Sequence, residues 1–129
     1  MGIKREACDK WFSDVVRKKA DFICESCGRN DIGMDCAHIH GRRAKSVRWS
    51  LDNAICLCRV CHMNYTSNPV DFTRWLEDYL GTAHLDILNE KRNVLLKTNK
   101  QLRREIAKHY RDEFKRMQED PDYQPISYN

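Results

Sequence analysis

The stretch from Ala54 to His62, AICLCRVCH, joins an apolar segment to a Cys-x-x-Cys pair and a histidine. Its apolar first part predicts a short β-strand. The residues after it predict a turn into a short helix that ends at Asn68-Pro69, because a proline interrupts helical hydrogen bonding. Two cysteines at this spacing present two thiolates to one zinc ion. The stretch therefore predicts a metal-held junction between a strand and a helix.

A second pair of the same spacing, Cys24 and Cys27, precedes this junction, so the pairs can supply the four ligands of a tetrahedral zinc site. Cys56 competes with Cys58 for the site, because residues two apart on a strand share a face. The Cys-x-x-Cys spacing to Cys61 favours Cys58. Four cysteine ligands leave the ion no open coordination position. We therefore expect a structural zinc that clamps the base of the long insertion between the pairs, with any chemistry located elsewhere.

The composition indicates a water-soluble chain, with 33% charged residues and a mean hydropathy of -0.76. No apolar run approaches the ~20 residues of a membrane span, so we expect no membrane association. The N-terminus lacks the apolar core of a secretory signal, which makes the cytoplasm the expected location. In that reducing compartment, seven cysteines favour metal binding over disulfides. Cys8 and Cys36 have no partner at ligand spacing and are expected to be buried thiols.

Positive charge is concentrated in two zones of a chain whose net charge is +4. The first zone, from Arg42 to Arg48, has four basic residues and no acid. The second, residues 94–117, has eight basic residues against three acids, and a solvated helix face explains it equally well. Basic zones on a small protein predict a nucleic-acid partner. The expected contacts to DNA phosphates come from four side chains: Arg42, Arg43, Lys45 and Arg48.

The remaining pattern predicts an α+β fold that is mostly helical. Helices are expected at residues 6–21, 70–81, 83–91 and 93–118, and a hairpin strand at 33–38. Trp49 is expected in the hairpin core, and the stripe from Phe72 to Leu80 is expected to pack over the zinc module. The last helix could lie along DNA, pair two copies in a homodimer, or fold back on the domain.

We interpret residues 1–129 as a single domain in four parts. An N-terminal helix is followed by a zinc-clamped core, a helical C-terminal part and a loose tail, which occupy residues 6–21, 22–68, 69–118 and 119–129.

Three of the five histidines, His38, His40 and His62, gather on the inserted hairpin and the helix after it. The order Cys-x-x-Cys, AHIHGR, RWSLDNAICLC and CRVCHMNY resembles the HNH (ββα-metal) endonucleases with a four-cysteine zinc site. It is most similar to the phage recombination and junction-cleaving nucleases of the Rap/NinG type. The resemblance covers about residues 22–68. It implies a zinc-stabilised ββα-metal centre, metal-dependent hydrolysis of DNA, and the cytoplasm of a bacterial host.

The resemblance also implies a role for each matching residue. His38 corresponds to the histidine that draws a proton from water, and Asn53 to the amide that pins the hairpin loop. His62 corresponds to the ligand of a catalytic Mg²⁺ or Mn²⁺ ion. Arg42 and Arg48 would contact phosphates or stabilise the transition state. A neutral imidazole with a pKa near ~6.5 suits general-base catalysis at cellular pH, and one cation can polarise the phosphate.

The residue before His38 is Ala37, although many HNH enzymes have an aspartate or histidine there as the second ligand of the catalytic ion. Either Asp35 or His40 could replace that ligand, and we favour His40 because some junction-cleaving relatives have a second histidine at this place. Alternatively, His62, substrate and waters hold the ion alone. A further alternative is an inactive site, and the chain would then be a zinc-finger DNA-binding or scaffold protein.

Overall fold

The computed structural model, which describes residues 4–129, has the expected α+β architecture: helices predominate around one two-stranded sheet. Its elements, in chain order, are α1 (Ala7–Lys19), β1 (Met34–His38), α2 (Lys45–Arg48), η1 (Leu51–Asn53), β2 (Ala54–Cys58), α3 (Arg59–Ser67), α4 (Pro69–Leu80), α5 (Thr82–Arg92) and α6 (Lys100–Glu119). The expected hairpin is confirmed, and so are the helices expected near residues 6–21, 70–81 and 83–91. Within the described part of the chain, no helix is long and apolar enough to cross a bilayer.

The hairpin pairs β1 with β2 in antiparallel register, from Met34 opposite Cys58 to His38 opposite Ala54. The connection between the two strands contains α2 and the 3-10 turn η1. The outer edge of β2 is covered by Glu25, whose backbone N–H donates to Cys56 O and whose carboxylate accepts from Cys56 N. This capping satisfies backbone groups that an edge strand otherwise leaves unpaired.

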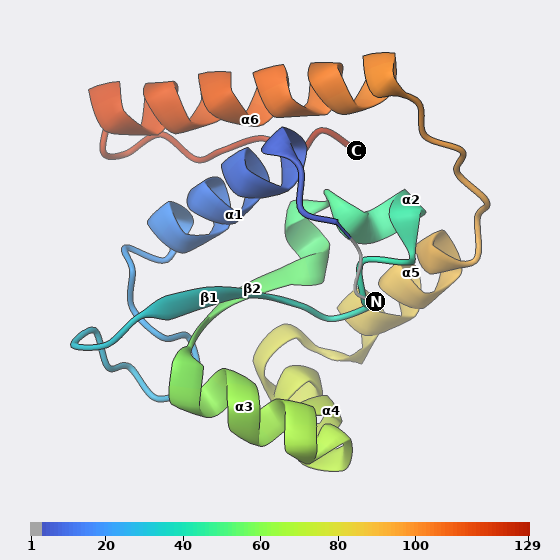
Figure 1. Ribbon diagram of the computed structural model, residues 1–129. Coiled ribbons are helices and arrows are strands. Elements are labelled where there is room, and N and C mark those ends of the chain that lie inside the picture. The colour runs from blue at the N-terminus through green and yellow to red at the C-terminus, as the bar shows by residue number, and fades with distance from the viewer. Residues whose placement is uncertain (1–3) are drawn as a thin grey trace.

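Two apolar clusters enclose the hairpin. One is shared by α1, α6 and the α2 region, and its fully buried members include Phe12, Trp49 and Tyr110. The other lies between β2, the cysteines and α4, where Leu76 is buried. Figure 1 shows the resulting order, with α1 between α6 and the hairpin, and α3 and α4 on the hairpin's other side. Trp49 is buried, but it lies in the cluster shared with α1 and α6 and not in the hairpin core where it was expected.

Helix α6 begins later than the sequence predicted, at Lys100 instead of Asn93. Asn99 caps it, because its side-chain oxygen accepts a hydrogen bond from Leu102 N at 2.8 Å. The apolar stripe of α6 is buried against α1, so this helix folds back on the domain. A homodimer that used the same stripe would require α6 to leave α1.

The prediction of a loose tail is wrong. Figure 1 shows the chain running back along α6 after Glu119. Ile126 N donates to the buried carboxylate of Glu113 at 2.7 Å, and the side chain of Asn129 donates to Ser46 O at 2.9 Å. Within α6, Arg116 pairs with this buried carboxylate at 3.0 Å, and the tail adds two further donors to it, Tyr123 Oη and Ile126 N, which fix the tail against the helix.

Candidate active site

Four cysteine sulfurs form one cluster at the base of the hairpin. Those of Cys24, Cys27, Cys58 and Cys61 all lie within 4.8 Å of one another. A zinc–sulfur distance of about 2.3 Å sets the sulfur–sulfur separation in a tetrahedron at roughly 3.8 Å. The sulfurs of Cys27 and Cys58 are 3.8 Å apart. The cluster could therefore hold a structural zinc, and Cys58 belongs to it while Cys56 does not.

Backbone N–H groups point at these sulfurs. Cys27 N donates to Cys24 Sγ at 3.5 Å, and Cys61 N donates to Cys58 Sγ at 3.4 Å. Gly28 takes a φ of +79°, which favours glycine, at the turn after the first pair. Burial alone would raise the pKa of the Cys24 thiol, but hydrogen bonds from the surrounding backbone lower it to about 6. Cys24 is therefore prepared to bind a cation as a thiolate.

The other three cysteines lie outside the cluster and behave as apolar thiols. Burial raises the pKa of Cys8 to about 11, and that of Cys36 and Cys56 to about 12. These thiols stay protonated at neutral pH. The expectation for Cys8 is confirmed, since it is 1% exposed, whereas Cys36 is only half-buried.

A cleft of about 650 Å³ runs along β1 between α1 and the start of α3. Its lining includes His38, His62, Asp35 and Arg42 from the predicted site, but not His40. Sequence reasoning missed several side chains that also line it, namely Arg5, Asp9, Ser13, Arg17 and Arg59. The spacing of four residues from Asp9 through Ser13 to Arg17 is a signal for one helix face that could have found part of this set.

His38 lies in this cleft with one ring nitrogen occupied. Its Nε2 is 3.1 Å from the backbone carbonyl of Arg48, and its ring stacks on Phe12. A carbonyl can only accept a hydrogen bond, so Nε2 carries the proton and Nδ1 keeps its lone pair. Burial lowers the pKa of His38 from its ordinary value. The imidazole is therefore neutral at cellular pH and able to accept a proton.

His62, in the first turns of α3, faces Asp35 on β1. Its Nδ1 donates to Asp35 Oδ2 at 3.0 Å. Two neighbouring ligands of an octahedral ion with ~2.1 Å bonds are also roughly 3.0 Å apart. The pair could thus hold a divalent cation in place of the shared proton. Arg59 also reaches Asp35, at 3.4 Å, but its side chain is 67% exposed and can move away.

Asn53 lies at the other end of the loop and is 0% exposed. Its Oδ1 accepts from His40 N at 2.9 Å and its Nδ2 donates to His40 O at 3.0 Å. One amide therefore fixes the chain just after His38. This is the position that the resemblance implied for the loop-pinning amide.

His40 does not share the cleft with His62. Its Nδ1 accepts from the guanidinium of Arg92 at 3.3 Å, and burial followed by the charge of Arg92 lowers its pKa. A cation beside His40 opposes the binding of a second one. The preference for His40 over Asp35 is therefore not supported, since Asp35 is the residue next to His62.

Arg48 is also misplaced as a phosphate contact. It is 3% exposed, and its guanidinium donates to both carboxylate oxygens of Asp9, at 3.0 and 2.6 Å. Trp49 Nε1 donates to the same carboxylate at 3.0 Å. The side chain therefore links α1 to the loop, and its role near the cleft is to place the carbonyl that orients His38.

Ala37 is 2% exposed and packs in the apolar cluster with Ile55 and the cysteines. An ion ligand at this position would have to replace a core side chain. The nearest acid on the same strand face is Asp35, which lies two residues earlier.

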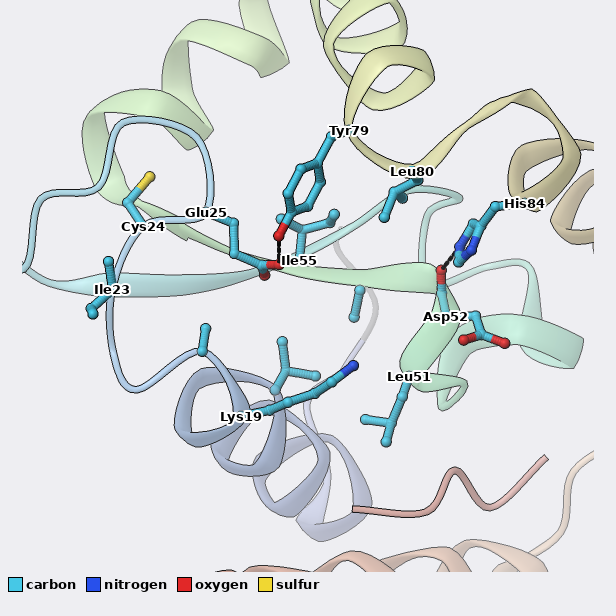
Figure 2. A pocket seen from close by; sticks show the side chains of 13 residues that line it. Lys19, Ile23, Cys24, Glu25, Leu51, Asp52, Ile55, Tyr79, Leu80 and His84 are labelled. Atoms are coloured by element: carbon cyan, nitrogen blue, oxygen red, sulfur yellow. Dashed lines mark hydrogen bonds between the residues drawn. The ribbon is translucent and has the colours of Figure 1, made fainter. Parts of the chain in front are cut away.

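A second cavity, shown in Figure 2, lies at the outer edge of β2. Two of its polar side chains bridge neighbouring elements: the hydroxyl of Tyr79 donates to Glu25 at 2.6 Å, and His84 Nε2 donates to Asp52 O at 2.8 Å. Tyr79 and His84 join α4 and α5 to the hairpin here. The cavity contains none of the predicted catalytic side chains.

The chain was compared with known proteins. The family model described as "NinG: Bacteriophage Lambda NinG protein" matches residues 4–120. The chain belongs to this family. Membership confirms the phage NinG part of the resemblance and suggests a recombination-related role. Searches of curated proteins and of solved structures found no match.

Proposed function

We propose that this NinG-family chain is a metal-dependent HNH endonuclease that hydrolyses DNA phosphodiester bonds. One observation carries the proposal: His38, neutral and with Nδ1 unprotonated, lines the same cleft as the His62–Asp35 pair. A zinc finger that only binds DNA has no use for this arrangement. Membership of a phage family supports DNA that arises in recombination, including branched forms, as the substrate.

In the proposed reaction His38 acts as the general base. Nδ1 takes a proton from a water molecule, whose oxygen attacks the phosphorus while the bond to the 3′ oxygen breaks. The leaving 3′ oxyanion takes a proton from solvent and His38 later releases its proton to solvent, so the products are a 5′-phosphate and a 3′-hydroxyl. The carbonyl of Arg48 stabilises the imidazolium that forms, because its oxygen accepts a hydrogen bond from Nε2–H before and after the proton transfer.

The developing negative charge needs cations. A Mg²⁺ or Mn²⁺ ion held by His62 and Asp35 would supply positive charge to the phosphate and to the leaving oxygen. With few protein ligands it would keep several waters, as magnesium prefers. Arg5, Arg17, Arg42 and Arg59 line the same cleft. Guanidinium groups bind phosphate oxygens in a bidentate manner, so these side chains suit the substrate's backbone.

The four-cysteine cluster has a structural role in this proposal. Zinc at the four cysteines would tie the junction of β2 and α3, next to His62, to the loop that carries Cys24 and Cys27. The proposal therefore assigns the zinc to stabilising the fold around the site and the second ion to the reaction.

The test is a cleavage assay on supercoiled plasmid and on a four-way junction, in Mg²⁺, Mn²⁺ and EDTA. We expect metal-dependent cleavage by the wild type and none by His38→Ala. Asn89→Ala is the control, because that side chain is exposed on α5 and does not line the cleft. Tight DNA binding with no cleavage in any metal would instead favour an inactive DNA-binding protein. The buried Ala37 is consistent with that alternative, because it offers no ligand to a catalytic ion.

A further inference from the structure

Basic side chains outside the cleft line three adjoining hollows that share one residue. Arg43 lines each of them. The first also contains His40 and Arg92, the second contains Lys4, Lys45 and Arg103, and the third follows residues 92–98 past Lys97. Figure 1 shows why they adjoin, since α2, α5 and the segment leading into α6 lie on one side of the molecule.

Four of these cations are not neutralised. Arg43, Lys45, Arg92 and Lys97 are exposed, and none of them forms an ion pair with another described residue. Among the described residues, the one acid that lines the hollows is Glu6, whose carboxylate pairs with Arg103 at 3.1 Å. Like charges brought together from separate segments repel one another, so a polyanion that binds them relieves that repulsion.

This surface continues the cleft. Gly41 and Arg42 line both the cleft and the first hollow. Arg92 is also held in place, because it donates to His40 Nδ1, and the backbone of His40 is fixed by Asn53. A chain of phosphates that leaves the cleft past Arg42 therefore meets Arg92 and Arg43 next.

We propose that Arg43, Lys45, Arg92 and Lys97 form a second phosphate-binding surface, the flanking surface, which binds the DNA backbone leading away from the scissile phosphate. The inference rests on the proposed function, since it extends the substrate path of the same site. It assigns a binding role to the end of α5 and to the segment before α6. It also gives His40 a role as the acceptor that orients Arg92, in place of the metal ligand expected from the sequence.

Exposed apolar side chains on the same segment fit this occupant. Val94 is 64% exposed and Leu95 is 91% exposed. Deoxyribose rings beside the phosphates would cover apolar surface that the chain itself leaves open to water.

The experiment measures DNA binding by the His38→Ala protein without added Mg²⁺ or Mn²⁺, so that cleavage does not interfere and the structural zinc is not chelated. The probe is a fluorescent duplex of about 30 base pairs, long enough to extend well past the cleft at 3.4 Å per base pair. The test variants add Lys97→Ala alone and Arg92→Ala with Lys97→Ala. The control adds Arg111→Ala with Lys115→Ala, two exposed cations farther along α6 that line none of the hollows.

For the double variant we expect about tenfold weaker binding at moderate salt, and a slope of log K against log salt that is smaller by about 1.8. Lys97→Ala alone should lower the slope by about 0.9. The control should bind like its parent. Zinc content and circular dichroism show whether each variant is folded.

An unchanged affinity and slope in the double variant would overturn the flanking surface and leave the nuclease intact, provided that the wild type cleaves DNA. Polyglutamate serves as a second probe, an acidic polypeptide without phosphates. If the double variant loses binding to polyglutamate but keeps its affinity for DNA, the flanking surface binds an acidic protein and the proposal is overturned. Failure of the parent protein to bind any DNA would instead contradict the proposed function itself.

Discussion

The side-chain amide of Asn53 makes two hydrogen bonds to the backbone of His40, one from each of its polar atoms. Ile39 N also donates to Asn53 O at 2.8 Å. The chain that leaves β1 after His38 is thereby fixed to the residue just before β2. The geometry of the proposed base depends on this closure of the loop.

Replacing Asn53 should impair both stability and cleavage. Asn53→Ala leaves two backbone groups of His40 without partners in a buried place, which costs about 1–3 kcal/mol for each group. Urea denaturation measures the loss. Single-turnover cleavage should fall more than tenfold, because the position of His38 is relaxed. Asn89→Ala, on the exposed face of α5, is the matched control. Full activity of Asn53→Ala would show that the loop needs no pin.

Much of the fold could be predicted because short patterns determine it. The Cys-x-x-Cys pairs locate the hairpin ends, and the apolar spacing locates α1, α4 and α5. The start of α6 was misplaced because Leu95, Leu96 and Lys97 favour a helix, whereas Asn99 caps the helix and sets its first residue at Lys100. The tail was missed because its partner Glu113 looks like a surface acid on its own helix. Glu113 is buried only because the tail and the rest of the domain pack against it, which its local sequence does not indicate.

The candidate site was predicted only in part, because local sequence patterns indicate some of its residues and not others. His38, Asn53 and His62 carry a local pattern, whereas the contacts between distant residues carry none. No spacing indicates that Arg48 points inward to Asp9, or that Arg92 comes to lie beside His40. Arg42, Arg43 and Lys45 remain predictions as DNA contacts.

Zinc binding should require Cys58 and not Cys56. We expect one zinc per chain in the wild type and in Cys56→Ala. Cys58→Ser should bind no zinc and should be unfolded. Structural zinc binding is worth on the order of 10–16 kcal/mol, more than a small domain's stability. Zinc content by elemental analysis and far-ultraviolet circular dichroism check this. Retention of a full zinc by Cys58→Ser would argue against the assigned ligand set.

Arg48 should contribute to stability through Asp9. Arg48→Met leaves a buried carboxylate without its cation, so unfolding should become easier by about 3–5 kcal/mol. Asp9→Asn should be destabilising by a similar mechanism. The double variant should lose less than the sum of the two single losses, because each removes the same pair. Denaturation midpoints measure the cycle. Simple additivity would mean that the two side chains act independently.

Cleavage should keep its rate on mild acidification. Burial lowers the pKa of His38 below its usual ~6.5, and the neutral form is the base. Activity should therefore be flat around neutrality and fall about tenfold per pH unit only below an inflection under ~6.5. A pH profile of single-turnover rates, at saturating metal, checks this. An inflection above ~6.5 would mean that His38 is stabilised as a cation.

The same shift couples His38 to folding. The unfolded imidazole binds a proton near pH ~6.5, whereas the folded one does so only at lower pH. The stability that depends on neutral His38 is therefore present above ~6.5 and is lost as the pH falls toward the folded pKa. Urea midpoints of the wild type and His38→Gln should converge on acidification, and parallel curves would contradict the linkage.

Removal of residues 125–129 should reduce cleavage without touching the cleft. Ser127 Oγ accepts from Leu51 N at 3.1 Å, and Asn129 donates to Ser46 O. These bonds are made on both sides of Arg48 and Trp49, at Ser46 and at Leu51. Tyr110 Oη also donates to Trp49 O and accepts from Tyr128 N, so the tail supports that carbonyl as well.

The carbonyl of Arg48 orients His38. Greater mobility of the segment between Ser46 and Leu51 should therefore disturb the orientation of the His38 ring. We expect a roughly tenfold slower single-turnover rate, with an unchanged KM for metal, and a loss of about 1–3 kcal/mol in unfolding free energy. Asn129→Ala alone removes one exposed bond and is the milder comparison. If the shortened chain cleaves at the full rate while being less stable, the tail supports the core only, and the orientation of His38 does not depend on it.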